Sequence, residues 1–285
     1  MPNVQAHDLC CAGRVVARYV WDSQLPETVS PRPYLHPVTT LGGTAVTGFM
    51  PDDHLHHLGA SIAVPVVNEA NFWGGRTYVA GRGPVSLDNH GHQRHDRWLH
   101  RSDDRLTQQL RWTGRDGRTL AHEQRALSVE TLTDDAWILR IDFALSSATT
   151  DPLRIDSPAV RGRDGAGYGG FFWRAPAGLD RVHAFGRQPG IDVHGSRDPY
   201  VVLTGSHHDT AAWTLIFLAA TPITDPWFVR SSDYAGVCSA IAWKRRLVIA
   251  PGQVFTRRLS VVIADGPPTG ATVEAAVAAG QEGNS

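Results

Sequence analysis

The stretch Ala136-Trp-Ile-Leu-Arg-Ile-Asp-Phe-Ala-Leu145 decides the fold class. Arg140 and Asp142 stand two positions apart, so in an extended chain their charged side chains share one face. Apolar side chains fill the opposite face, and the β-branched and aromatic residues of the stretch favour strands. The pattern predicts a strand of an antiparallel sheet with one buried face.

Similar patterns occur along the chain and predict further strands, at residues 14–21, 61–67, 106–112 and 257–263. Turn-forming residues separate them at 41–43, 114–117, 133–135 and 250–252, a spacing typical of hairpins. Only residues 271–280 have helix-forming composition. We expect an all-β fold, a large antiparallel two-sheet sandwich with a short C-terminal helix.

Length and composition indicate one domain. With 285 residues, 42% of them hydrophobic, the chain can bury one large core, and we expect a single domain over residues 1–285 with its core at about 14–265. Its 27 basic and 28 acidic side chains leave a net charge of -1, which offers no basic surface for nucleic acid.

The cysteines, the lysine and the chain ends bear on compartment and chemistry. Cys10, Cys11 and Cys238 are an odd number without zinc or redox spacing. Lys244 is the only lysine, which argues against Schiff-base chemistry. The N-terminus lacks signal-peptide features, and no apolar stretch reaches the roughly 20 residues that cross a bilayer. We expect a reduced, cytoplasmic protein with no membrane partner.

The stretch Asp52-Asp-His-Leu-His-His57 concentrates groups that bind metals or move protons. If it is extended, His54 and His56 share one face about 6–7 Å apart, while Leu55 enters the core and His57 turns to the core side or ends the strand. That geometry suits a divalent metal completed by Asp53, or two proton donors beside a sugar oxygen. Alternatively, single histidines cap a loop by ordinary hydrogen bonds.

A second histidine-rich stretch, 90–96, is a candidate for the opposite wall of the same site, and the sequence does not rank its members His90, His92 and His95. Nearby, His122 and Glu123 are neighbours in a strand-like segment, so only one of them can face a cavity. We select Glu123 as the catalytic carboxylate.

The motif Gly167-Tyr-Gly-Gly-Phe-Phe-Trp-Arg174 supplies what a carbohydrate site requires besides an acid and a base. Sugar C–H faces stack on aromatic rings, and sugar hydroxyls need fixed donors such as a guanidinium group. Tyr168, Trp173 and Arg174 fit those roles, whereas Phe171 and Phe172 suit the core.

Together, four motifs resemble the bacterial family labelled "methane oxygenase PmoA" or PmoA-like, since recast as a domain of unknown function. They are Arg32-Pro-Tyr-Leu-His-Pro37, Asp53-His-Leu-His-His57, Asn71-Phe-Trp73 and residues 167–174. The resemblance implies a β-supersandwich similar in outline to galactose mutarotase, a sugar-related substrate, and substrate-binding roles for Arg32, His36, Asn71, Trp73 and His92. It also makes Asp225, Trp227 and Arg230 secondary candidates. Methane oxidation is rejected, because the protein that the label evokes spans a membrane.

No dinucleotide fingerprint, phosphate loop, nucleophile elbow or His-Glu-x-x-His motif occurs, so no nucleotide cofactor is expected. Two functions remain open. One is an enzyme acting on a sugar, keto-sugar or glycoside by histidine and carboxylate acid–base chemistry, of the lyase, hydrolase or epimerase type, with or without a metal. The other is a non-catalytic sugar-binding or accessory protein of a sugar-catabolic pathway.

Overall fold

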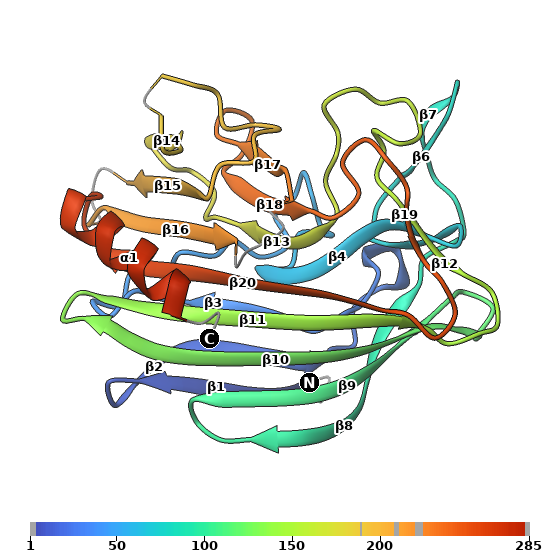
Figure 1. The fold of residues 1–285 in the computed structure, drawn as a ribbon, viewed down its shortest axis with the longest axis horizontal. Helices are drawn as coiled ribbons and strands as arrows, with labels where there is room; N and C mark the ends of the chain where they lie inside the picture. Colours follow the sequence, from blue (N-terminus) through green and yellow to red (C-terminus); the bar gives the residue numbers. More distant parts are fainter. Residues whose placement is uncertain (1–3, 189, 208–210, 220–224, 283–285) are drawn as a thin grey trace.

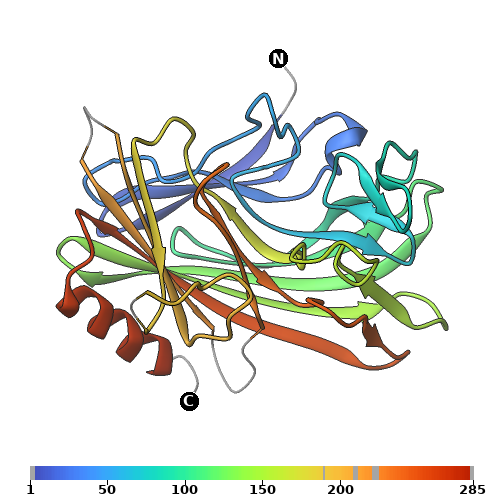
Figure 2. The ribbon, with the colours of Figure 1, turned by 90° about the horizontal axis from the view of Figure 1, so that it is seen from above.

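Two antiparallel sheets stack as layers in the computed structural model, which describes residues 4–188, 190–207, 211–219 and 225–282 (Figures 1 and 2). The ten-stranded sheet contains β1 (Gln5–Cys11), β2 (Arg14–Asp22), β3 (Tyr34–Val38), β4 (Ala60–Val67), β5 (Ala70–Phe72), β12 (Leu153–Asp156), β13 (Gly170–Arg174), β17 (Trp227–Arg230), β18 (Gly236–Ala240) and β19 (Leu247–Ile249). The eight-stranded sheet runs in the order β14 (Arg181–Phe185), β15 (Tyr200–Ser206), β16 (Trp213–Ala219), β20 (Val254–Asp265), β11 (Ala136–Ser147), β10 (Thr119–Thr133), β9 (Arg105–Thr113) and β8 (His92–Arg101). A small hairpin pairs β6 (Thr77–Val79) with β7 (Gly83–Val85). The predicted all-β sandwich is confirmed.

Strand β11 behaves as its alternation predicts. Leu139, Ile141 and Phe143 point into the core between the sheets, whereas Ile138 lies in a separate cluster on the outer face of the same sheet. The predicted strands at 14–21, 61–67, 106–112 and 257–263 all lie within observed strands. The buried core begins before residue 14, where the sequence predicted its start, since Leu9 of β1 in the ten-stranded sheet is completely buried.

The C-terminal helix covers the outer face of the eight-stranded sheet. Helix α1 (Gly270–Glu282) packs Ala276 and Ala279 against Ile138 and Val262, and Figure 2 shows it outside that layer. Small side chains let the helix lie close to the sheet. The predicted helix at 271–280 is confirmed.

The outer face of the ten-stranded sheet positions the candidate site. In β13, Phe171 and Trp173 point into the sandwich core, so Phe172 and Arg174 point outward. Phe172 pairs with Cys238 of β18, which pairs with Phe228 of β17, so the three side chains form an apolar row across this face. Loops carrying histidine, tyrosine and tryptophan side chains cover that row.

Candidate functional site

The histidine-rich stretch at 52–57 forms tight turns and not a strand. The His54 N–H donates to the Pro51 carbonyl at 2.8 Å, and the His57 N–H donates to the His54 carbonyl at 2.9 Å. Leu55 is 51% exposed, so the expectation that it enters the core is wrong. The turns direct His57 inward instead, and its side chain is buried.

The turns nevertheless bring all three imidazoles together. The ring centroids of His54 and His57 lie 4.5 Å apart, those of His56 and His57 4.8 Å, and those of His54 and His56 5.6 Å. His54 Nδ1 lies 2.8 Å from Oδ2 of Asp53, so the imidazole donates there and keeps Nε2 free of that bond. Both Asp53 and His54 remain accessible to solvent.

Aromatic side chains surround the three imidazoles. Phe172 lies beneath His57 with 4.8 Å between ring centroids, and Trp73 meets His57 edge-on at 5.9 Å. Tyr234, from the turn between β17 and β18, contacts both His54 and His57 at 5.4 and 5.3 Å. We call His54, His56, His57 and these three aromatic residues the histidine cluster.

Arg32 holds the backbone around the cluster. Its guanidinium donates to the carbonyl oxygens of His56 at 2.7 Å and Trp73 at 3.1 Å, and Nε donates to Ser61 Oγ. Burial, and secondarily the charge of Arg125, lowers the pKa of Arg32 to about 9. Arg32 therefore positions the loops, since its donors are occupied by protein atoms.

Asn71 and two glycines shape the loop that carries Trp73. The Asn71 Oδ1 atom accepts hydrogen bonds from the N–H groups of Trp73 and Gly74, both at 2.8 Å. Gly74 and Gly75 have φ angles of +98° and +65°, and a Cβ atom on either would come within 2.9 Å of the His56 side chain. Only glycine allows the loop to pass this close to His56.

Burial keeps two of the imidazoles neutral. It lowers the pKa of His56 to about 3, with a further contribution from the charge of Arg32. It also lowers the pKa of His57, assisted by neighbouring His56. By contrast, the pKa of Asp53 is lowered mainly by its hydrogen bond from His54, so this carboxyl stays ionised. At neutral pH the neutral imidazoles of His56 and His57 therefore lie close to the Asp53 carboxylate and its partner His54.

Arg174 lies beside the cluster on the same sheet face. Its guanidinium carbon lies 4.4 Å from the centre of the Tyr234 ring. Arg174 is 4% exposed, and its Nε and Nη1 atoms are buried without a hydrogen-bond partner among the described residues. Nδ1 of His57 is in the same condition.

Further aromatic side chains pack along the apolar row, away from the three imidazoles. Tyr168 contacts Trp73 at 4.6 Å and Phe228 at 5.2 Å, and His194 contacts Phe228 at 5.2 Å. Arg230, a secondary candidate from the sequence, lies over Phe228 at 4.2 Å. Sequence reasoning missed His194 and Tyr234, because no motif marks them, and it assigned Phe172 to the core; strand register and loop packing bring all three here.

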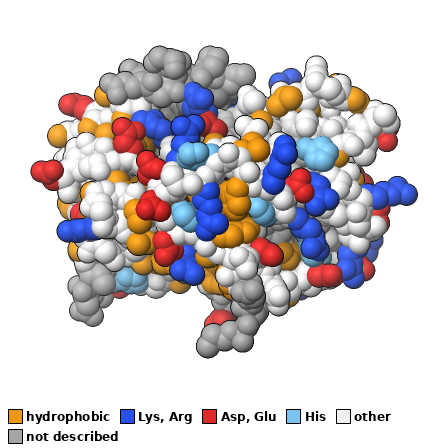
Figure 3. Space-filling view, turned by 90° about the horizontal axis from the view of Figure 1, so that it is seen from below, with side chains coloured by type: hydrophobic (Ala, Val, Ile, Leu, Met, Phe, Trp, Pro, Cys, Tyr) orange, Lys and Arg blue, Asp and Glu red, His pale blue; other side chains and the backbone are white. Residues whose placement is uncertain are grey.

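Of the second histidine-rich stretch, His90 comes nearest to the cluster. His90 is buried, and its Nε2 lies 2.8 Å from the carbonyl oxygen of Gly75, the glycine that packs against His56. His92 and His95 instead line a separate pocket of about 660 Å³, together with Trp21 and Arg111. Figure 3 shows the side of the molecule along β8, where apolar side chains are bordered by arginine and histidine.

The structure places three other candidates away from the cluster. Glu123 lies in the sandwich interior, where it accepts hydrogen bonds from Arg125 and Trp112. Trp173 also points inward and donates to the Val46 carbonyl at 2.9 Å. The expected alternation of His122 and Glu123 holds, but the face of Glu123 is the core and not a cavity. His36, on β3, lies 3.0 Å from Oγ1 of Thr47 and stacks on Phe49, not on the three imidazoles of the cluster.

The family of unknown function DUF6807 matches residues 6–278 of the chain. The chain belongs to this family. Among curated proteins, none matches this DUF6807 chain. The resemblance to the PmoA-like family stays a prediction.

Three solved structures are similar to this DUF6807 chain. A putative aldose 1-epimerase from Escherichia coli K12 has 11% identity and a TM-score of 0.46, covering 92% of this chain and 100% of that chain. A galactose mutarotase related enzyme from Lactobacillus acidophilus has 11% identity and a TM-score of 0.43, covering 93% and 99%. A GalM/aldose epimerase homologue from C. elegans has 7% identity and a TM-score of 0.39, covering 93% and 100%. At these values the chemistry of this DUF6807 chain has to be argued from its own side chains.

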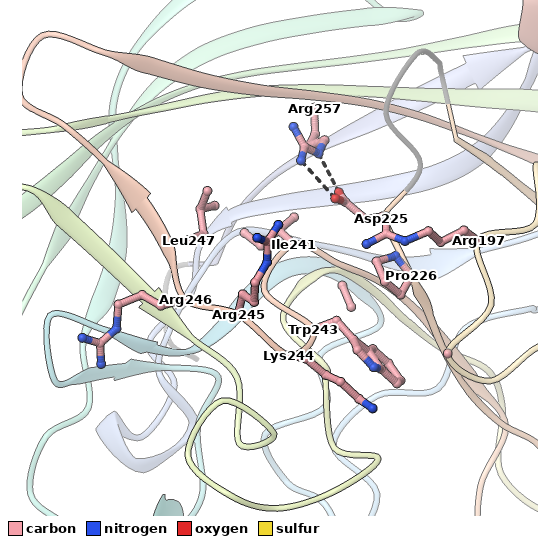
Figure 4. A pocket seen from close by; sticks show the side chains of 12 residues that line it. Arg197, Asp225, Pro226, Ile241, Trp243, Lys244, Arg245, Arg246, Leu247 and Arg257 are labelled. Atoms are coloured by element: carbon pink, nitrogen blue, oxygen red, sulfur yellow. Dashed lines mark hydrogen bonds and ion pairs between the residues drawn. The ribbon is translucent and has the colours of Figure 1, made fainter.

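A basic pocket of about 740 Å³ lies beyond Trp243, whose ring also contacts His194 (Figure 4). Lys244 and Arg245 line it, and Arg257 forms a two-point ion pair with Asp225 at 2.6 and 3.0 Å. No imidazole is among its described lining residues. We therefore assign the candidate site of this DUF6807 chain to the histidine cluster, where the groups that can move protons meet.

Neither a metal cluster nor a membrane helix is found in the described part of the chain. No group of three or more His, Cys, Asp or Glu side chains there is arranged to hold a metal ion, so the predicted metal at Asp53, His54 and His56 gains no support. No described helix is long and apolar enough to cross a membrane.

Proposed function

We propose that this protein is an enzyme that transfers protons on a sugar or sugar derivative, with the histidine cluster as its active site. The observation that carries the proposal is that a carboxylate-bound imidazole, His54, lies within 5.6 Å of two further imidazoles, counted between ring centroids. Such a group can serve lyase, hydrolase or epimerase chemistry, because each needs a base and an acid close to one carbon or oxygen.

The protonation states support this assignment. Burial lowers the pKa of His56 to about 3, so this imidazole is neutral near pH 7 and can hydrogen-bond a ligand, but it is a weak base. The Asp53 carboxylate accepts a hydrogen bond from Nδ1 of His54, which orients this ring and leaves Nε2 to take a proton. We assign His54 as the residue that takes and returns the proton, and His56 as a neutral hydrogen-bonding partner.

The surrounding rings suit a sugar. Trp73, Tyr168 and Tyr234 present aromatic surface beside the imidazoles, and pyranose C–H faces stack on such rings. Their hydroxyl groups and the indole edge add polar contacts at the ends of the rings. A cytoplasmic setting is part of the proposal, since Cys10, Cys11 and Cys238 are all free thiols.

The test is His54→Ala in the full chain. The substrates to screen are reducing sugars, keto-sugars and glycosides, followed by NMR in D₂O so that exchange at an acidic carbon is visible as well as product. We expect turnover to fall by about 10²–10⁴-fold, the range for loss of a positioned general base. His122→Ala is the matched control, because His122 lies on β10 with an exposed side chain.

Two outcomes would contradict the proposal. Unchanged kinetics in a folded His54→Ala protein would exclude His54 from the chemistry. Sugar binding without turnover of any substrate in the screen would favour the accessory sugar-binding protein. Metal analysis of the purified protein adds a second criterion, because a stoichiometric metal would argue against a purely sugar-binding role.

A further inference from the structure

Arg174 is a buried cation that forms no ion pair with any residue the structure describes. The guanidinium is covered by the Tyr234 ring, and neither Nε nor Nη1 reaches an acceptor among the described residues. Burial lowers the pKa of Arg174 but leaves the group charged, because an arginine side chain keeps its proton in proteins. Buried charges in proteins are normally paired and hydrogen-bonded.

The Asp53 carboxylate acts on Arg174 without pairing with it. Asp53 accepts a 2.8 Å hydrogen bond from His54, and its side chain is 57% exposed. Its charge partly offsets the effect of burial on the pKa of Arg174, but the two side chains form no ion pair. Nε and Nη1 of Arg174 therefore remain as buried hydrogen-bond donors without an acceptor among the described residues.

Further arginine charges lie near Arg174. Arg230 lies on β17 opposite Gly236, and Gly236 lies opposite Arg174 on β13, so both arginines occupy one row of the outer sheet face. Both charges act on Tyr234. Arg32 adds a second buried cation, behind His56. Asp53 supplies one negative charge beside the imidazoles, which does not balance these arginine charges.

From this imbalance we infer that the site takes its sugar as an anion, with a carboxylate or phosphate group of the ligand bound by Arg174. The inference rests on the proposed function and names its substrate class. An oxyanion would accept the free guanidinium donors in charge-assisted hydrogen bonds. A ligand hydroxyl would in turn bond to Nδ1 of His57, which also lacks a partner. Tyr234 lies over the guanidinium and belongs to a turn with exposed residues at 231–233, so the inference requires this side chain to move when the ligand binds.

Calorimetric titration of the full chain tests the inference with three matched sugar sets. These are neutral hexoses, the corresponding hexuronates and the corresponding hexose 6-phosphates, each in the gluco, galacto and manno configuration. Acetate and inorganic phosphate serve as anions without a sugar. We expect one acidic set to bind about 10- to 100-fold more tightly than the neutral set, as a charge-assisted pair predicts, and the preferred set identifies carboxylate or phosphate.

Arg174→Met should abolish the preference for the acidic sugar, and Arg174→Lys should keep part of it, because lysine retains the charge but not the planar donors. Arg118→Met is the control, because it removes one positive charge from an exposed hairpin. The side chain of Arg118 is 82% exposed. The unliganded Arg174→Met protein should melt at or above the temperature of the parent protein, because it no longer buries an unpaired charge.

The outcomes separate this inference from the proposed function. Neutral and acidic sugars binding equally, or an Arg174→Met protein that keeps the preference, would overturn the anion site and leave sugar chemistry intact. Acetate or phosphate binding through Arg174 without any sugar binding would sustain the anion site and overturn the sugar. No binding by any compound would overturn both, and a marked loss of melting temperature in Arg174→Met would show that the guanidinium is structural.

Discussion

Two buried arginines in this protein have opposite surroundings. Arg125, in the core between the sheets, donates to both carboxylate oxygens of Glu123 at 2.7 and 2.8 Å and to Gln93 at 2.8 Å. Trp112 adds a 2.7 Å hydrogen bond to the same carboxylate. Arg174, on the outer face of the ten-stranded sheet, has Nε and Nη1 without partners among the described residues.

The comparison separates groups that hold the fold from groups kept for a ligand. A buried polar network with every member satisfied stabilises one arrangement of the core. A buried group left unsatisfied costs free energy, and such groups concentrate at functional sites. The chain therefore satisfies its polar groups where the two sheets meet and leaves donors and acceptors unused where the histidines meet.

The largest expected effect is at the satisfied arginine. Arg125→Met leaves the Glu123 carboxylate buried without its cation, and we expect the free energy of unfolding to fall by about 3–5 kcal/mol. Urea denaturation followed by tryptophan fluorescence measures it. Arg94→Met, on the exposed side of β8, is the matched control and should change stability by less than about 0.5 kcal/mol. Equal losses in the two variants would remove the contrast between the regions.

Local patterns predicted the fold better than they predicted the site. Alternation in β11 depends only on neighbouring residues, so it gave the correct face for Leu139 and Ile141. The same rule placed His122 and Glu123 on opposite faces correctly, but it could not show that the face of Glu123 meets Arg125 and not a ligand.

The residues of the site were harder to predict, because their positions depend on strand register and on contacts between segments far apart in the sequence. In β13 the substrate-facing role was expected for Trp173, yet register turns Trp173 inward and Phe172 toward His57, because neighbours on a strand face opposite ways. The histidines could be found because they are contiguous in sequence. Tyr234 is far from them in sequence and could not be found.

The second-largest expected effect is a loss of stability at acidic pH that arises from the buried histidines of the cluster. Folding lowers the pKa of His56 to about 3 and lowers that of His57, so between about pH 6.5 and 4.5 the unfolded chain binds protons that the folded chain excludes. Stability is then complete above pH 6.5 and falls as the pH decreases, by up to about 1.4 kcal/mol per pH unit for each group. Urea denaturation at pH 7, 6, 5 and 4.5 measures the slope.

The control for this slope is a protein in which both histidines are replaced by asparagine. His56→Asn/His57→Asn should lose most of the dependence between pH 6.5 and 4.5, whereas Leu139→Ala in the core should lower stability about equally at each pH, since it changes no titratable group. A double variant with the parent slope would show that the acid sensitivity arises outside the histidine cluster.

The smallest effect is expected at Leu55, between the site histidines. Leu55→Ser should change the free energy of unfolding by less than about 0.5 kcal/mol, because the side chain is 51% exposed and gives up little contact with the core. Leu58→Ala, three residues along, should cost about 2–5 kcal/mol, because Leu58 is completely buried beside Val20 and Tyr34. Similar losses for both leucines in urea denaturation would mean that the histidine stretch is extended with Leu55 inside. The turns that gather the three imidazoles would then be wrong, and with them the contrast between the site and the core.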